Sequence, residues 1–164
     1  MKISELENAP QWLLEAKVEN EDVEIIDGIV TWKSGTWLEG YWEDGSWESG
    51  TWEYGTFENG TWTNGVWKGG TWKYGTWKNG FWEYGLWRKG TWHDGIWNDG
   101  VWKDGSWDDG VWKYGIWKDG IWRNGIWKNG TWENGIWLSG IWSDGDWVMG
   151  TWLGGLCKDE NRGK

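Results

Sequence analysis

Cysteine, proline and histidine each occur only once in the 164 residues, and no apolar run is long enough to span a bilayer. A single cysteine cannot build a disulfide framework, which favours a cytoplasmic location. The first seven residues carry charge where the apolar core of a secretory signal would begin. We therefore expect a protein with no membrane segment, no secretory leader and no disulfide.

Tryptophan and glycine are abundant instead, with 25 and 29 residues. Trp occupies every fifth position from Trp32 to Trp152, with Phe57 as the one substitution, and Gly follows three residues after each. Disordered segments are poor in aromatic residues, so this tract is predicted to fold. A period of five fits neither a helix nor a flat strand and identifies an internal repeat.

Each pentad reads as Gly at position one, a variable residue at two, Trp at three, and polar residues at four and five. Position four is charged in 17 of 25 pentads and therefore faces water. Positions two and three alternate, so only one of them can point inward. Position two admits Ser46 and Phe81 in equivalent places, which a close-packed interior would not tolerate. Position three hardly varies in size, so Trp is predicted to fill the interior.

Glycine is predicted to have two roles in each pentad. Position five is Asn or Asp in 13 pentads, and pairs such as Asn59-Gly60 favour turns because Gly accepts a positive φ. Gly also lies two residues before Trp on the same face, where its missing side chain would leave room for the indole. The backbone carbonyls at these corners are the expected acceptors for the buried indole N–H groups.

The number of pentads in one coil is inferred from position two. At a spacing of four pentads, Thr fills six of seven slots, whereas spacings of two and three pentads give more mixed columns. This alignment favours four pentads per coil, and 25 pentads would then make a rod of roughly 30 Å at the usual strand spacing. The threonines of this column form the candidate interaction face: Thr31, Thr51, Thr71, Thr91, Thr131 and Thr151.

The pentad at residues 130–134, GTWEN, resembles the unit of pentapeptide-repeat proteins, and Phe57 matches the central residue of that family. The resemblance covers residues 31–155 and implies an all-β fold, a right-handed quadrilateral β-helix (β-solenoid) with about four pentads per coil. Near-uniform Trp departs from the family's usual Leu or Phe. The Gly-x-Trp-x-x-Gly spacing is also similar to MORN-type repeats, which are stacked hairpins, and this alternative stays open.

Three segments are expected. Residues 1–30 are predicted to cap the N-terminal end, with a short helix starting after Pro10, because an open solenoid edge favours aggregation. Residues 31–157 are the Trp-rich solenoid, with Cys157 as a small apolar filler in a degenerate last pentad. Residues 158–164 are a polar C-terminal tail.

Residues capable of catalysis are few, and no enzyme activity, cofactor or metal is expected. His93 lies at outward position four and is predicted to be a surface residue. Asp108 and Asp109 are adjacent carboxylates expected to be solvated. Asp104, Asn124 and Asp144 share a column at a spacing of four pentads and are interpreted as an ordinary polar ladder.

The net charge is −10, but residues 1–30 hold eight acids against two lysines, so the repeat surface is mixed. Direct nucleic-acid binding would need exposed indoles and is not expected. We expect a non-enzymatic structural or protein-binding scaffold with a protein partner, no membrane contact and scope for an end-to-end dimer. Resemblance to bacteriophage proteins implies a phage-encoded origin, with a cytoplasmic or virion location. The alternative is an acidic DNA mimic that inhibits a topoisomerase or another nucleic-acid enzyme, as the family resemblance implies.

Overall fold

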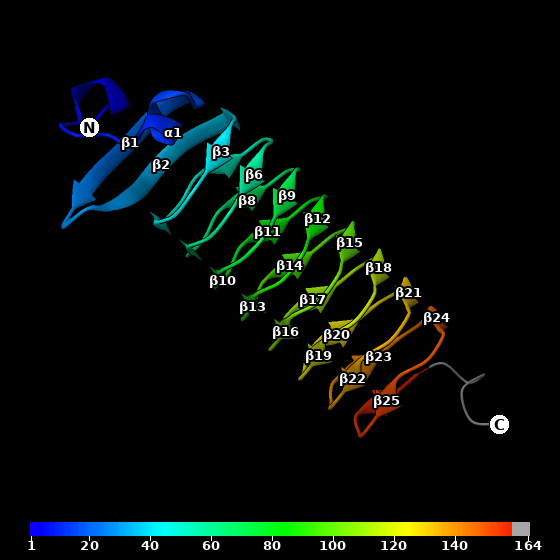
Figure 1. Cartoon of the computed structure of the whole chain (residues 1–164). Helices are drawn as coiled ribbons and strands as arrows, with labels where there is room; N and C mark the ends of the chain where they lie inside the picture. The colour runs from blue at the N-terminus through cyan, green and yellow to red at the C-terminus, as the bar shows by residue number, and fades with distance from the viewer. Residues whose placement is uncertain (159–164) are drawn as a thin grey trace.

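The computed structural model describes residues 1–158 as one continuous parallel β-solenoid with a small N-terminal cap (Figure 1). From residue 41 onward, one two-residue strand recurs in every pentad, and parallel pairing joins strands that are three pentads apart. Thr76, for example, pairs with Thr61 and Thr91. One coil therefore contains three pentads, and the predicted all-β solenoid is confirmed.

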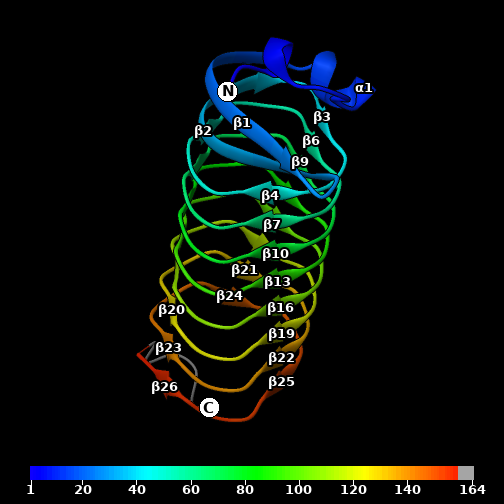
Figure 2. The ribbon, with the colours of Figure 1, turned by 90° about the vertical axis from the view of Figure 1, so that its left-hand side faces the viewer.

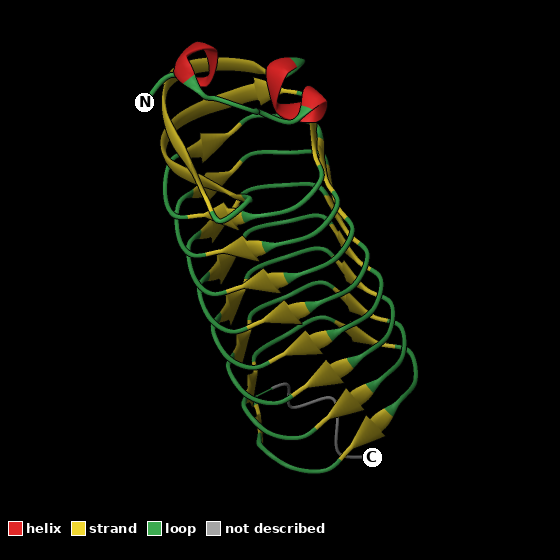
Figure 3. Ribbon diagram, turned by 60° about the vertical axis from the view of Figure 1, so that its left-hand side comes forward, coloured by secondary structure: helices red, strands yellow, loops and turns green. Residues whose placement is uncertain are grey.

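Each coil contributes one short strand to each of three faces, and Figures 2 and 3 show the strands of successive coils in register. β2 (Ile29–Glu39) supplies the first strand of faces 1 and 2. Face 1 continues through β4 (Ser46–Trp47), β7 (Thr61–Trp62), β10 (Thr76–Trp77), β13 (Thr91–Trp92), β16 (Ser106–Trp107), β19 (Ile121–Trp122), β22 (Ile136–Trp137) and β25 (Thr151–Trp152). Face 2 continues through β5 (Thr51–Trp52), β8 (Val66–Trp67), β11 (Phe81–Trp82), β14 (Ile96–Trp97), β17 (Val111–Trp112), β20 (Ile126–Trp127), β23 (Ile141–Trp142) and β26 (Leu156–Cys157). Face 3 consists of β3 (Tyr41–Trp42), β6 (Thr56–Phe57), β9 (Thr71–Trp72), β12 (Leu86–Trp87), β15 (Val101–Trp102), β18 (Ile116–Trp117), β21 (Thr131–Trp132) and β24 (Asp146–Trp147).

The predicted four pentads per coil is wrong, because every parallel pair of strands is offset by three pentads. A period of five fixes the corner spacing but leaves the number of corners open. Three indoles meet edge to face in each layer: Trp97 lies 6.0 Å from both Trp92 and Trp102, at 73°. A fourth side would widen the cross-section and leave space at its centre, which close packing opposes. About eight coils at ~4.8 Å make a rod of roughly 40 Å.

The core is three columns of stacked indoles. Every Trp from Trp32 to Trp142, together with Phe57, is fully buried, as predicted from the constancy of position three. Trp77 and Trp92 lie 4.7 Å apart with an interplanar angle of 6°, and the neighbouring coils repeat this geometry. Offset stacking along the rod and edge-to-face contact across it are the two arrangements that the aromatic quadrupole favours.

Two backbone hydrogen bonds per pentad join successive coils. The N–H of position two donates to the carbonyl of Gly in the coil before, as from Thr76 to Gly60 at 2.9 Å. The N–H of position four donates to a Trp carbonyl, as from Lys78 to Trp62 at 2.8 Å. These bonds fix the vertical register of every outward side chain.

The glycines allow the coils to approach closely. Gly110 has a φ of +116°, and a Cβ there would lie 2.5 Å from the carbonyl oxygen of Gly95 in the preceding coil. The predicted corner conformation is therefore confirmed. The sequence also predicted that Gly leaves room for the indole. This role is smaller, because a Cβ at Gly110 would first meet the backbone of Gly95 in the preceding coil rather than an indole ring.

The expected acceptors for the indole N–H groups are mostly missing. Trp127 Nε1 donates to the carbonyl oxygen of Asp144 at 3.1 Å, two positions beyond the paired Trp of the next coil. The N–H groups of Trp92, Trp97 and Trp102, and of most other core indoles, are buried without an acceptor. The core is therefore held together mainly by the packing of the indoles rather than by their hydrogen bonds.

The N-terminal segment 1–30 covers the first coil. It forms η1 (Ile3–Glu5), α1 (Gln11–Leu14) and β1 (Lys17–Ile26), and β1 pairs antiparallel with β2. The predicted short helix after Pro10 is present, and the longer strand β1 covers more of the edge than the helix does. Leu13 and Val23 are fully buried against the core, and Trp12 meets Trp42 edge to face at 5.0 Å.

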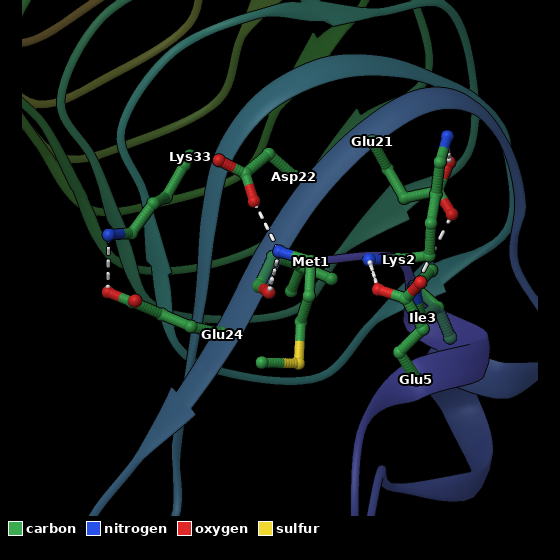
Figure 4. Close-up of polar contacts among 9 residues, drawn as sticks. Met1, Lys2, Ile3, Glu5, Glu21, Asp22, Glu24 and Lys33 are labelled. Carbon is green, nitrogen blue, oxygen red and sulfur yellow. Dashed lines mark hydrogen bonds and ion pairs between the residues drawn. The ribbon is translucent and has the colours of Figure 1, made fainter.

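Polar contacts hold the cap together (Figure 4). The amino group of Met1 forms an ion pair with Asp22 and donates to the carbonyl oxygen of Val23 at 3.0 Å. Lys33 pairs with Glu24 across the β1–β2 hairpin at 2.8 Å. These contacts tie the start of the chain to the strand that pairs with the first coil.

Candidate interaction faces

Position two of each pentad forms a straight outward ladder on each face, and the three ladders differ in chemistry. On face 1, six successive coils present a hydroxyl: Thr31, Ser46, Thr61, Thr76, Thr91 and Ser106. On face 2, seven successive coils present an apolar group: Val66, Phe81, Ile96, Val111, Ile126, Ile141 and Leu156. Face 3 is mixed, from Tyr41 to Asp146.

The predicted threonine strip does not exist as one face. With three pentads per coil, a spacing of four pentads moves each successive residue to the next face. Thr31, Thr91 and Thr151 lie on face 1, Thr51 on face 2, and Thr71 and Thr131 on face 3. The contiguous hydroxyl ladder of face 1 includes only two of the six predicted threonines, Thr31 and Thr91.

The apolar ladder of face 2 is partly open to solvent. Ile96 and Ile126 keep 38% and 36% of their surface exposed, and Val66, Phe81 and Val111 are half-buried. The Lys113 ammonium lies 5.7 Å from the centre of the Phe81 ring, within cation–π range. Charged and polar residues lie on both sides of the ladder, which leaves an apolar stripe about 30 Å long at ~4.8 Å per coil.

On face 3, position four carries a cation in four successive coils: Lys73, Arg88, Lys103 and Lys118. No other ladder at position four contains more than two consecutive Lys or Arg side chains. Glu58 precedes this column and Glu133 follows it. Lys73 pairs with Glu58 at 2.7 Å, and Lys118 pairs with Glu133 at 3.3 Å.

Ion pairs between successive coils shift several pKa values. The hydrogen bond from Lys73, followed by one from Tyr41, lowers the pKa of Glu58. Partial burial, and then the contact with Glu58, raises the pKa of Tyr41. The hydrogen bond to Glu53 in the preceding coil raises the pKa of Lys68.

His93 lies on the surface, as predicted, and belongs to a polar network on face 1. Its Nδ1 lies 2.8 Å from Asp108 in the next coil. Arg123, one coil further on, donates from Nε to Asp108 at 3.1 Å. Asp109 points elsewhere: it accepts the Gly110 N–H at 2.8 Å and a hydrogen bond from Asn124 at 3.3 Å. The adjacent carboxylates therefore have separate, structural partners.

Position five forms the corners of the rod. Nine Asx side chains accept the N–H of the following Gly at 2.6–2.8 Å, which confirms the predicted Asx-Gly turns. Asp104, Asn124 and Asp144 do not share a column, because a spacing of four pentads places them at three different corners. The observed ladders join Asx side chains three pentads apart, as between Asn134 and Asp119 at 3.4 Å.

Cys157 takes the inward slot of the last described pentad, paired with Trp142, and packs against the core as expected of an apolar filler. Within residues 1–158, no group of three His, Cys, Asp or Glu side chains is placed to hold a metal ion. No helix in the same part of the chain is long and apolar enough to cross a membrane.

Comparisons with protein-family models, with curated protein sequences and with solved structures found no match to this chain. The stacked hairpins of the MORN alternative are excluded for residues 41–158, where the paired strands are parallel. The apolar ladder and the cation column are not visible at the predicted spacing of four pentads, which mixes residues from all three faces at positions two and four. Reading both positions at a spacing of three pentads would have found them.

Proposed function

We propose that this protein is a non-enzymatic scaffold that binds a protein partner along one side of the rod. The observation that carries this proposal is that one position of each pentad fills the interior while the other side chains vary on the surface. Fully buried aromatic residues fill the interior from Trp32 to Trp142, and the variable side chains point outward. A rigid backbone therefore displays three different ladders at a constant spacing, and sequence variation changes the display without changing the fold.

Face 2 is the proposed docking surface. Contiguous exposed apolar groups on a soluble protein indicate interaction sites. The apolar ladder continues over seven coils and has polar margins, the arrangement of a protein interface with an apolar centre and a polar rim. A folded protein with a flat apolar strip fits this surface, because a straight, regular ladder offers no deep pocket for a small ligand.

The five-residue repeat supports a relationship to pentapeptide-repeat proteins, with three rather than four pentads per coil. The DNA-mimic alternative would need a continuous acidic surface. The cation column on face 3 and the interleaved lysines on face 2 interrupt such a surface, so the protein-binding scaffold is favoured.

The proposal can be tested by site-specific photo-crosslinking in cells of the source organism. A photo-reactive residue replaces Val111 on face 2, with replacements at Thr91 on face 1 and Val101 on face 3 as controls. We expect a discrete adduct from position 111 alone. Ile96→Lys with Ile126→Lys should abolish the adduct, whereas the equally spaced pair Thr76→Lys with Ser106→Lys should not. Equal adducts from all three faces, or none from face 2, would overturn the assignment.

A further inference from the structure

We infer that the cation column on face 3 is a binding site for a compact oligophosphate, such as a diphosphate or triphosphate group. The backbone fixes the spacing of the column. The N–H groups of Arg88, Lys103 and Lys118 donate to the carbonyls of Trp72, Trp87 and Trp102, each at 2.8 Å. Neighbouring cations therefore originate from backbone positions about 4.8 Å apart, on one line and on one side of the rod.

Like charges placed directly opposite each other on paired strands are unfavourable. Elsewhere on the rod, opposite charges often meet across coils: Lys68 pairs with Glu53 at 2.8 Å, and Arg123 pairs with Asp108. In the cation column, the outer members Lys73 and Lys118 are paired in this way. Arg88 and Lys103 form no close ion pair with any residue in 1–158, and Arg88 has only a longer-range attraction to Glu58. The centre of the column therefore holds two adjacent cations without a direct acidic partner.

A hollow of about 440 Å³ lies over this centre. Lys73, Arg88, Lys89 and Lys103 line it, together with the half-exposed ring of Tyr74 and two acids, Glu58 and Asp104. Both acids already have partners, because Glu58 pairs with Lys73 and Asp104 lies 3.6 Å from Lys89. The hollow therefore has unpaired positive charge from Arg88 and Lys103 and the aromatic side of Tyr74.

The chemistry of these groups indicates phosphate oxygens. The planar guanidinium of Arg88 can donate two parallel hydrogen bonds to one phosphate group. The ammonium of Lys103, one coil away, can then neutralise a second phosphate joined to the first. Phosphate groups linked through one oxygen are close enough together to match cations that start about 4.8 Å apart.

The acids at both ends of the column limit the length of the ligand. Glu43 and Glu58 precede the cations at position four of face 3, and Glu133 follows them; Asp146 lies one coil further on, at position two of the same face. A long polyanion lying along the rod would run over these carboxylates and be repelled by them. A compact anion that covers two coils lies against Arg88 and Lys103, and the two acids that line the hollow, Glu58 and Asp104, are each paired with a lysine. The flanking acids therefore favour an oligophosphate over a nucleic-acid strand.

The test is isothermal titration calorimetry of the full chain at low ionic strength, with inorganic tripolyphosphate as the probe. The key variant is Arg88→Gln with Lys103→Gln. The matched control is Lys113→Gln with Lys128→Gln, which removes two cations from position four of adjacent coils on face 2. We expect saturable binding by the wild type, at least a tenfold loss in the key variant, and less than a twofold change in the control. Circular dichroism verifies that both variants fold.

Two further probes identify the source of the phosphate groups. ATP tests whether a nucleoside triphosphate uses the same site, and a 20-nucleotide single strand tests an extended polyanion. Tripolyphosphate and ATP should bind more tightly than the strand, with the same dependence on Arg88 and Lys103. Three results would each overturn the inference: no binding of tripolyphosphate, an equal loss in both double variants, or tighter binding of the single strand. None of these results bears on face 2, so the proposed docking surface is tested separately.

Discussion

The indole of Trp97 lies 4.7 Å from the indole of Trp112 in the next coil, with the two ring planes 6° apart. The same relationship recurs along all three columns of the core, and both rings are fully buried. Such indoles have no contact with water except at the two ends of the rod. We therefore expect blue-shifted tryptophan fluorescence that resists quenching by acrylamide. Red-shifted, readily quenched emission would contradict the buried core.

Truncating a core side chain should lower the free energy of unfolding much more than truncating a surface side chain. Trp97→Ala removes a buried ring from a stack and should cost roughly 3–5 kcal/mol of unfolding free energy. Lys118→Ala removes an exposed side chain whose ion pair with Glu133 is screened by solvent, and should cost no more than about 0.5 kcal/mol. Urea denaturation measures both. Similar losses in the two variants would mean that inside and outside are wrongly assigned.

A methyl group at a corner glycine should be poorly tolerated. Gly110→Ala forces a φ of +116° on a residue with a Cβ and places that Cβ 2.5 Å from the Gly95 carbonyl oxygen. We expect a loss of at least about 2 kcal/mol. Gly69→Ala is the control, because its nearest neighbours would lie 3.6 Å from the new Cβ and its φ is not in the positive range. Gly69→Ala should change stability by less than about 0.5 kcal/mol. A Gly110→Ala protein as stable as the wild type would refute the close approach of the coils.

Engineered cysteine pairs can show whether a coil contains three or four pentads, because only residues in register on adjacent coils can form a disulfide. Thr76 and Thr91 are direct partners on adjacent strands of face 1, so cysteines at these two positions should form a disulfide in a Cys157→Ser background. Cysteines at positions 71 and 91 lie on different faces and should remain reduced. Electrophoresis with and without reductant, after thiol labelling, distinguishes the two. A disulfide between positions 71 and 91, with none between positions 76 and 91, would support four pentads per coil instead.

Lowering the pH should reduce the stability of the protein by protonating Glu58. Lys73 holds the pKa of Glu58 below its ordinary value of 4.5, so the stabilisation is fully present above that pH and is lost as the pH falls through the lowered value. The side chain is about one-third exposed, which limits the effect to about 1 kcal/mol. Between pH 6 and pH 3, Glu58→Gln should reduce the fall in the urea midpoint. An unchanged pH profile in that variant would exclude this contribution.

Much of the fold follows from the sequence alone, because the pentad has strong local constraints. The constancy of position three places Trp inside, and the charge at position four places Lys118 and its equivalents outside. The Asx-Gly pairs predict the corners, and the sequence after Pro10 predicts the short helix α1. Each of these inferences depends on a residue and its nearest neighbours in the chain, where side-chain size and backbone conformation are decisive.

The number of sides was decided only by the tertiary structure. Every pentad has the same corner, so the local sequence cannot distinguish three corners per coil from four. The packing of three indoles edge to face selects the triangular coil, and that packing depends on residues brought together from successive pentads and coils. The faces follow from this choice, because three pentads per coil separate Thr51 from Thr71 and align Arg88 with Lys103. The candidate sites are therefore products of the coil length, which the core geometry sets and the repeat unit alone does not.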